Sequence, residues 1–126
     1  MKVKNIKIGI KGLDDGLEDF KKAIRAARSG HAPRKLDDRI DFVSVEAMQS
    51  VLTPRRLELL QAIRVKKPGS IYELAHMVKR DLKNVQDDVS LLHRIGLLSL
   101  SRTRKARRSV VPRVDYDSLQ LRIPIG

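Results

Sequence analysis

The sequence predicts a small α+β fold in which three helices and a two-stranded hairpin occupy residues 52–114. A strand, a helix and a second strand are predicted ahead of them in residues 1–51, and a further strand in residues 115–126. Apolar residues recur at helical spacing in the middle of the chain and alternate in short runs on both sides. The helical segments also carry their own start and stop residues. A chain of 126 residues fits one domain with short extensions.

The N-terminal extension begins with an alternating run. Ile6, Ile8 and Ile10 keep a period of two, which predicts a short strand over residues 3–10. Gly30 is expected to end the helix that follows, and acidic residues at the start and basic residues at the end of this helix suit its dipole. Helical spacing is carried by four apolar residues, Leu17, Phe20, Ile24 and Ala27.

The extension closes with a second strand and a short helix. Residues 31–38 are polar and contain Pro33, so they are predicted to form a loop. Alternation over residues 39–45 predicts the strand. Ser44 is a typical N-cap, and we expect a short helix to run from it to residue 51.

The first helix of the middle segment starts with an N-cap and a proline. Thr53 is followed by Pro54 at the first helical position, where a missing N–H costs nothing. Residues 67–69, Lys-Pro-Gly, end the helix. It carries an apolar stripe of three residues, Leu57, Leu60 and Ile63.

The second and third helices have equally clear boundaries. Ser70 and Glu73 form a capping box, and a turn over residues 79–81 separates the two helices. Asp81 is the predicted N-cap of the third helix and Gly96 its C-terminal stop. The apolar residues are Ile71, Leu74, Ala75 and Val78 in the second helix, and Leu82, Val85, Val89 and Leu92 in the third.

Strands are then predicted over residues 97–100 and 109–114, joined by a basic loop over residues 102–108. Three helices followed by a hairpin with a charged tip is the order of a winged helix-turn-helix, whose last helix enters the major groove of DNA.

The third helix is the candidate recognition helix, because its side opposite the apolar stripe is polar. At 100° per residue that side carries Lys83, Asp87, Ser90 and Arg94, with Asn84 and Gln86 on its flanks. Asn and Gln suit adenine edges and Lys suits guanine. Asp87 repels phosphate unless it accepts from cytosine or pairs with Lys83. The alternative is an ordinary amphipathic surface helix.

Basic residues gather in the predicted wing. Residues 102–113 hold six positive charges and no acid, which favours contact with the DNA backbone or minor groove over a merely solvated surface. The candidates there are Arg102, Arg104, Lys105, Arg107 and Arg108, with Arg113 as the sixth charge. Basic residues at both ends of the first helix are candidate phosphate contacts or generic surface charge: Arg55, Arg56, Lys66 and Lys67.

Composition narrows the classes of function. A net charge of +12 and a pI of about 10.5 favour a polyanionic partner. Aromatic residues make up only 3% of the chain, too few for a platform that stacks single-stranded bases. The chain has no cysteine, no apolar run long enough to span a membrane, and no apolar segment typical of a secretory signal. We therefore expect a cytoplasmic protein, associated with the nucleoid when bound to DNA.

An enzyme is not predicted. His31, His76 and His93 lie far apart in sequence without metal-ligand spacing, and the chain has no P-loop or nucleophile elbow. Paired acids such as Asp87-Asp88 are more often helix caps and solvated faces than acid/base pairs. No catalytic residue, metal or cofactor is therefore expected.

Two segments, Leu52 to Leu60 and Arg80 to Val89, resemble a family of predicted prokaryotic DNA-binding regulators with a MarR-like winged helix. Some members of that family are regarded as antitoxin components of toxin–antitoxin pairs. The helix before Gly30, residues 42–48 and residues 119–123 are also similar to it. The resemblance implies a winged-helix fold, binding to double-stranded DNA and, for an antitoxin, a co-encoded toxin as partner.

Three hypotheses follow. The favoured one is a homodimeric, sequence-specific repressor, because a single winged helix contacts few base pairs. Its dimer interface is expected in residues 3–29 and 115–126, which the winged helix does not need. The second is an antitoxin that uses the N-terminal residues to neutralise a toxin and regulates its own operon. The third is a sequence-neutral chromatin or RNA-binding protein. The expected strand contacts of the dimer are Ile6, Ile8, Ile10, Leu121 and Ile123.

Overall fold

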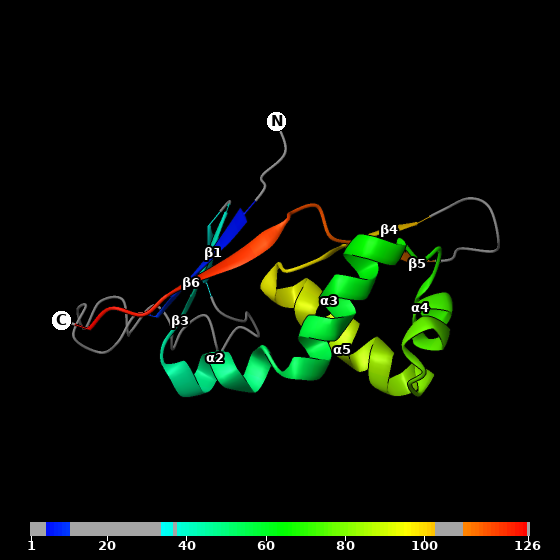
Figure 1. The fold of residues 1–126 in the computed structure, drawn as a ribbon, viewed down its shortest axis with the longest axis horizontal. Helices are drawn as coiled ribbons and strands as arrows, with labels where there is room; N and C mark the ends of the chain where they lie inside the picture. The colour runs from blue at the N-terminus through cyan, green and yellow to red at the C-terminus, as the bar shows by residue number, and fades with distance from the viewer. Residues whose placement is uncertain (1–4, 11–33, 37, 103–109, 126) are drawn as a thin grey trace. The chain divides into compact units, whose positions relative to one another are not determined.

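The computed structural model describes residues 5–10, 34–36, 38–102 and 110–125 (Figure 1). Within these ranges the chain forms four helices and six strands, which confirms the predicted α+β class. None of the helices in this part of the chain combines the length and the apolar character needed to cross a membrane.

The chain divides into two compact units. Unit 1 consists of residues 1–52 and 116–126, and unit 2 consists of residues 53–115. Residues 1–51 and 116–126, which were predicted to form separate extensions, therefore belong to one unit.

Unit 1 contains a four-stranded sheet with the strand order β2-β3-β1-β6. Its central strand β1 pairs in parallel with β3 on one side and with β6 on the other, while β2 pairs antiparallel with β3 (Figure 1). The sheet thus joins two strands, β1 and β6, that lie on either side of unit 2 in the sequence. The strands are β1 (Asn5–Ile10), β2 (Arg34–Leu36), β3 (Arg39–Phe42) and β6 (Ser118–Arg122).

One face of this sheet is apolar. Ile8 lies opposite Ile40 of β3 and opposite Leu121 of β6, and Ile6 lies opposite Leu119. Paired residues of neighbouring strands point to the same face, so these side chains form one continuous apolar surface. Ile6, Ile8 and Ile40 are buried.

Helix α2 (Val45–Val51) follows β3 and contacts it. Its N-cap is Ser44, whose hydroxyl accepts a hydrogen bond from the Ala47 N–H at 3.0 Å, as predicted. Met48 is the buried residue of this helix.

The strand predicted over residues 3–10 is confirmed for residues 5–10, the part of it that the structure describes. The strand predicted over residues 39–45 is confirmed with an earlier end, at Phe42. The predicted loop over residues 31–38 is wrong in part, because β2 lies within it. This segment is a strand because its backbone pairs with that of β3. Such pairing does not require an alternation of apolar and polar residues, so the sequence of the segment did not indicate it. The helix predicted around Phe20, with its end at Gly30, lies outside the described residues.

Unit 2 contains three helices and a two-stranded antiparallel sheet, and β5 lies against α3 and α4 (Figure 1). Thr53 and Ser70 cap α3 and α4 as predicted, each accepting from the N–H three residues later. Arg64 of α3 donates to the Val114 carbonyl at 3.1 Å near the end of the unit. The elements are α3 (Pro54–Lys66), α4 (Ile71–Val78), α5 (Leu82–Ile95), β4 (Ser99–Arg102) and β5 (Val110–Arg113).

The core of unit 2 is aliphatic and corrects the predicted stripe of α3. Leu57 is 39% exposed, whereas Leu59, Leu60 and Ile63 are buried. Steps of three residues drift by 60° around a helix, so Leu57 and Ile63 cannot share the centre of one face. The remaining core residues include Leu74, Ala75, Val85, Val89, Leu92, Ile95 and Leu97.

The predicted strand over residues 97–100 starts two residues too early. Leu97 and Leu98 are buried before β4 begins at Ser99. The Leu97 N–H donates to the Leu92 carbonyl at 2.9 Å and so completes the end of α5 instead of entering the sheet.

Candidate nucleic-acid interface

Helix α5 is fixed at both ends. The Asp81 carboxylate caps its start by accepting from the Asn84 N–H at 3.3 Å. Gly96 ends it with a φ of 91°, a left-handed conformation that a residue with a Cβ adopts only with strain. Both ends were predicted, and together they fix which fourteen residues make up the helix.

The two sides of α5 differ as the helical spacing predicts. Four apolar side chains are buried in unit 2, namely those of Val85, Val89, Leu92 and Ile95. All six residues proposed to contact DNA are exposed: Lys83, Asn84, Gln86, Asp87, Ser90 and Arg94. The helix therefore presents a polar surface of basic, amide, hydroxyl and carboxylate groups. Such groups match the hydrogen-bonding edges of bases in a major groove.

Asp87 interrupts the positive charge of this surface. Asp87 and Lys83, which lies one turn earlier, are both in the described part of the chain, and neither forms an ion pair there. The pairing that would have neutralised Asp87 is absent here. The carboxylate remains available as a hydrogen-bond acceptor, and cytosine N4 is the base donor that suits it.

The candidate phosphate contacts of α3 fall into two groups. Arg55, Lys66 and Lys67 are exposed. Arg56 instead turns its Nε to Asp88 of α5 at 3.1 Å, with a side chain only 21% exposed. The guanidinium of Arg56 thus links α3 to α5. Nothing in the structure supports the prediction that it contacts a phosphate.

Of the candidate wing residues, the structure describes only Arg102. It is exposed at the end of β4, where it pairs with Val110 of β5. Arg104, Lys105, Arg107 and Arg108 lie outside the described residues. The antiparallel pairing of β4 and β5 brings the two ends of this basic segment together.

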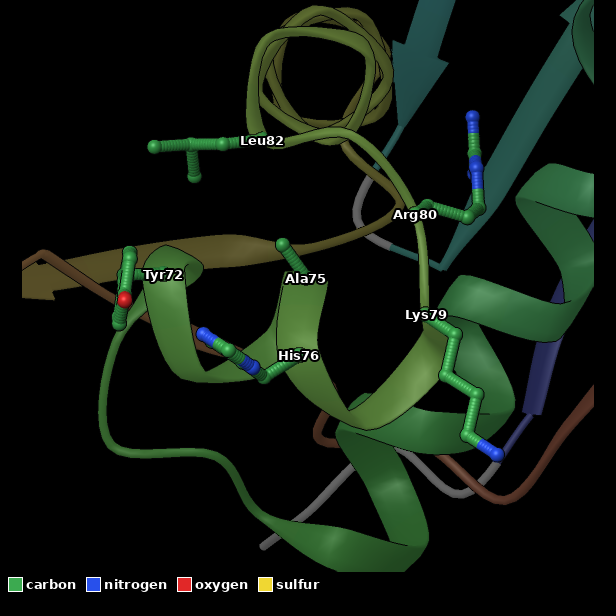
Figure 2. Close-up of a pocket in the computed structure, with 6 residues that line it drawn as sticks. All are labelled: Tyr72, Ala75, His76, Lys79, Arg80 and Leu82. Atoms are coloured by element: carbon green, nitrogen blue, oxygen red, sulfur yellow. The ribbon is translucent and has the colours of Figure 1, made fainter.

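A shallow hollow of about 390 Å³ lies between α4 and the start of α5. Figure 2 shows Tyr72 and His76 along one side of it and Leu82 across from them, while Lys79 and Arg80 extend away from these rings. The two rings meet edge to face with centroids 4.8 Å apart. None of these residues was predicted to bind a partner, because their placement around one hollow depends on the turn that brings the two helices together.

The two contacts of Asp88 are a second feature that the sequence did not predict. Its Oδ1 accepts from Arg56 Nε at 3.1 Å and its Oδ2 accepts from Arg80 Nη2 at 2.8 Å. The Asp88 and Arg80 side chains are each 14% exposed. One carboxylate therefore joins α3, the turn before α5, and α5 itself.

By its fold, unit 2 belongs to the small α+β proteins. Its helix α5 is capped at both ends, buries one side and displays a polar side, and a short antiparallel sheet follows it. The chain belongs to the HVO_A0114 family, whose sequence profile matches residues 51–121. The match covers all of unit 2 and extends into β6. No curated protein and no solved structure matches the chain.

Proposed function

We propose that this chain is a non-enzymatic regulator that binds double-stranded DNA with sequence specificity and places α5 in the major groove. The observation that carries the proposal is the exposed side of α5, where six side chains able to bond to bases or phosphates lie opposite a buried apolar stripe. A net charge of +12 supports a polyanionic partner. In this proposal unit 2 is a winged helix-turn-helix resembling the MarR-like regulators, and β4 and β5 form its wing.

Selection of binding sites from random duplex DNA tests the proposal, followed by binding titrations on the selected and on scrambled sequences. Lys83→Ala and Asn84→Ala are expected to erode discrimination by about 1–3 kcal/mol each, as for a lost base contact. Lys7→Ala is the matched control, because Lys7 is an exposed cation on β1 of unit 1. Failure of the wild-type protein to prefer any duplex contradicts the proposal. Equal losses on all sequences assign the two residues to the DNA backbone.

The wing has its own test. Converting Arg104, Lys105, Arg107 and Arg108 to Ala together should flatten the dependence of affinity on salt. Each phosphate contact removed lowers the slope of log affinity against log salt by about 0.9. An unchanged slope excludes these residues from the interface.

We further propose that the DNA-binding form is a homodimer. Ile6 and Ile8 are buried in the sheet of their own chain, which leaves half-buried Ile10 and the more exposed Leu121 and Ile123, 50% and 43% exposed, as the predicted contacts for a second copy. Light scattering should show a dimer that Leu121→Asp dissociates. Gln120→Asp adds the same charge on the opposite face of β6 and should leave the dimer intact. A wild-type monomer that binds a single site tightly contradicts this part of the proposal.

A further inference from the structure

We propose that Asp88 is a positioning residue that sets the rotation of α5 and thereby decides which side chains of α5 face the bases. The inference rests on the DNA-binding function proposed above. It concerns a residue that makes no DNA contact in that proposal, because its carboxylate faces the rest of unit 2.

The geometry of the carboxylate carries the argument. Its two oxygens serve different parts of unit 2: Oδ1 is held by Arg56 in the first turn of α3, and Oδ2 by Arg80 in the turn between α4 and α5. A carboxylate held on both oxygens from two directions fixes a helix in rotation as well as in position. Apolar contacts are non-directional and constrain rotation less.

Burial makes these contacts hard to replace with water. Asp88 and Arg80 are 14% exposed and Arg56 is 21% exposed, so their charge-assisted hydrogen bonds act in a partly desolvated setting. The cluster is also short of acceptors, since Arg80 Nη1 is buried without a hydrogen-bond partner. Arg80 in particular has no second acceptor for this buried nitrogen, so losing the Asp88 carboxylate removes the charge that offsets it.

The position of Asp88 along α5 links it to the reading face. Asn84, a candidate base contact, lies one turn earlier on the same side of the helix, and Asp87 and Ser90 are close in sequence. Successive residues are 100° apart around the axis, so a rotation of a few tens of degrees changes which of these side chains points at a base edge. Base discrimination is more sensitive to such a change than backbone contact.

The test compares affinity for a selected operator with affinity for scrambled DNA. In Asp88→Asn the ratio of the two affinities should fall about tenfold, the discrimination of one base contact, while affinity for scrambled DNA is kept. Glu58→Gln, at an exposed acid on α3, makes the same change in charge and should leave the ratio unaltered. A role in stability alone lowers both affinities in proportion to the folded fraction and leaves their ratio constant, which would overturn the proposal.

Arg56→Lys serves if Asp88→Asn does not fold, because it keeps the charge and removes the guanidinium fork. Here too the affinity ratio should fall, by less than in Asp88→Asn because the charge is kept, and an unchanged ratio again overturns the proposal. Residual dipolar couplings of Cα–Hα bonds, which point away from the helix axis, provide a readout without DNA. In Asp88→Asn or Arg56→Lys the couplings of α5 should no longer fit one alignment tensor with those of α3. An unaltered orientation refutes positioning by Asp88, whereas absence of sequence preference in the wild type refutes the proposed function instead.

Discussion

Val89 and Ser90 are neighbours in α5, but they belong to its two different sides, the one that packs in the core and the one proposed to contact DNA. Val89 is 1% exposed within unit 2, and Ser90 is exposed on the candidate reading face. Replacing each in turn with alanine should therefore affect different properties. Val89→Ala should lower stability, and Ser90→Ala should lower DNA discrimination.

The magnitudes follow from burial. Val89→Ala removes two buried carbon groups worth about 0.8 kcal/mol each in transfer free energy. The cavity that remains adds to this loss, so the total should be about 2.5 kcal/mol. Ser90→Ala removes an exposed hydroxyl and introduces a better helix former, which should change stability by less than about 0.5 kcal/mol.

Urea unfolding followed by circular dichroism at 222 nm measures both effects, since three of the four described helices lie in unit 2. With an m-value of about 1.5 kcal/mol/M, Val89→Ala should lower the unfolding midpoint by roughly 1.7 M. The midpoint of Ser90→Ala should stay within about 0.3 M of the wild type. Equal shifts for the two variants would refute the assignment of faces on α5, and with it the basis of the DNA-binding proposal.

Two further predictions concern unit 1. Gly9→Ala should destabilise the sheet by about 1–3 kcal/mol in urea unfolding, because its Cβ would collide with the Oδ1 of buried Asp41; unchanged stability would show that this carboxylate moves freely. Burial raises the pKa of the Tyr116 phenol above its ordinary value of 10.0, so the folded state keeps a proton that the unfolded state loses. The stabilisation by Tyr116 is present below about pH 10 and declines as pH rises further, so the stability difference between wild type and Tyr116→Phe should narrow from about pH 10 upward. A constant difference contradicts the raised pKa.

Local signals explain why so much of unit 2 was predictable. Thr53, Ser70 and Asp81 cap the three helices through hydrogen bonds to residues only three positions away, and Gly96 ends the last helix through its own backbone conformation. These interactions depend on neighbours in sequence, so the sequence alone contains them. The exposed side of α5 was predictable for the same reason, because helical spacing sorts its residues onto two sides.

Features made by distant pairing were not predictable. β2 is a strand because β3 offers it a backbone partner, and its own residues give no alternating pattern. The bond between Arg56 and Asp88 spans 32 residues. Helical spacing places Asp88 off the polar side that carries Asp87, but it cannot show which arginines the carboxylate meets. Leu57 looked like a core residue because spacing fixes the relative angles of side chains but not which side of α3 packs inward.

The pairing of β1 with β6 bears on how the protein is made. The Ser118 hydroxyl donates to Asn5 Oδ1 at 2.6 Å across a separation of 113 residues, with all of unit 2 in between. At 5–20 residues per second, β1 emerges from the ribosome roughly 6–20 s before the strand that completes its sheet. Unit 2 can fold during that interval, while the isoleucines of β1 still lack a partner on one side. Until β6 is made, β1 offers an unpaired edge, so the sheet of unit 1 is more exposed to misassembly during synthesis than unit 2, whose elements follow one another in sequence.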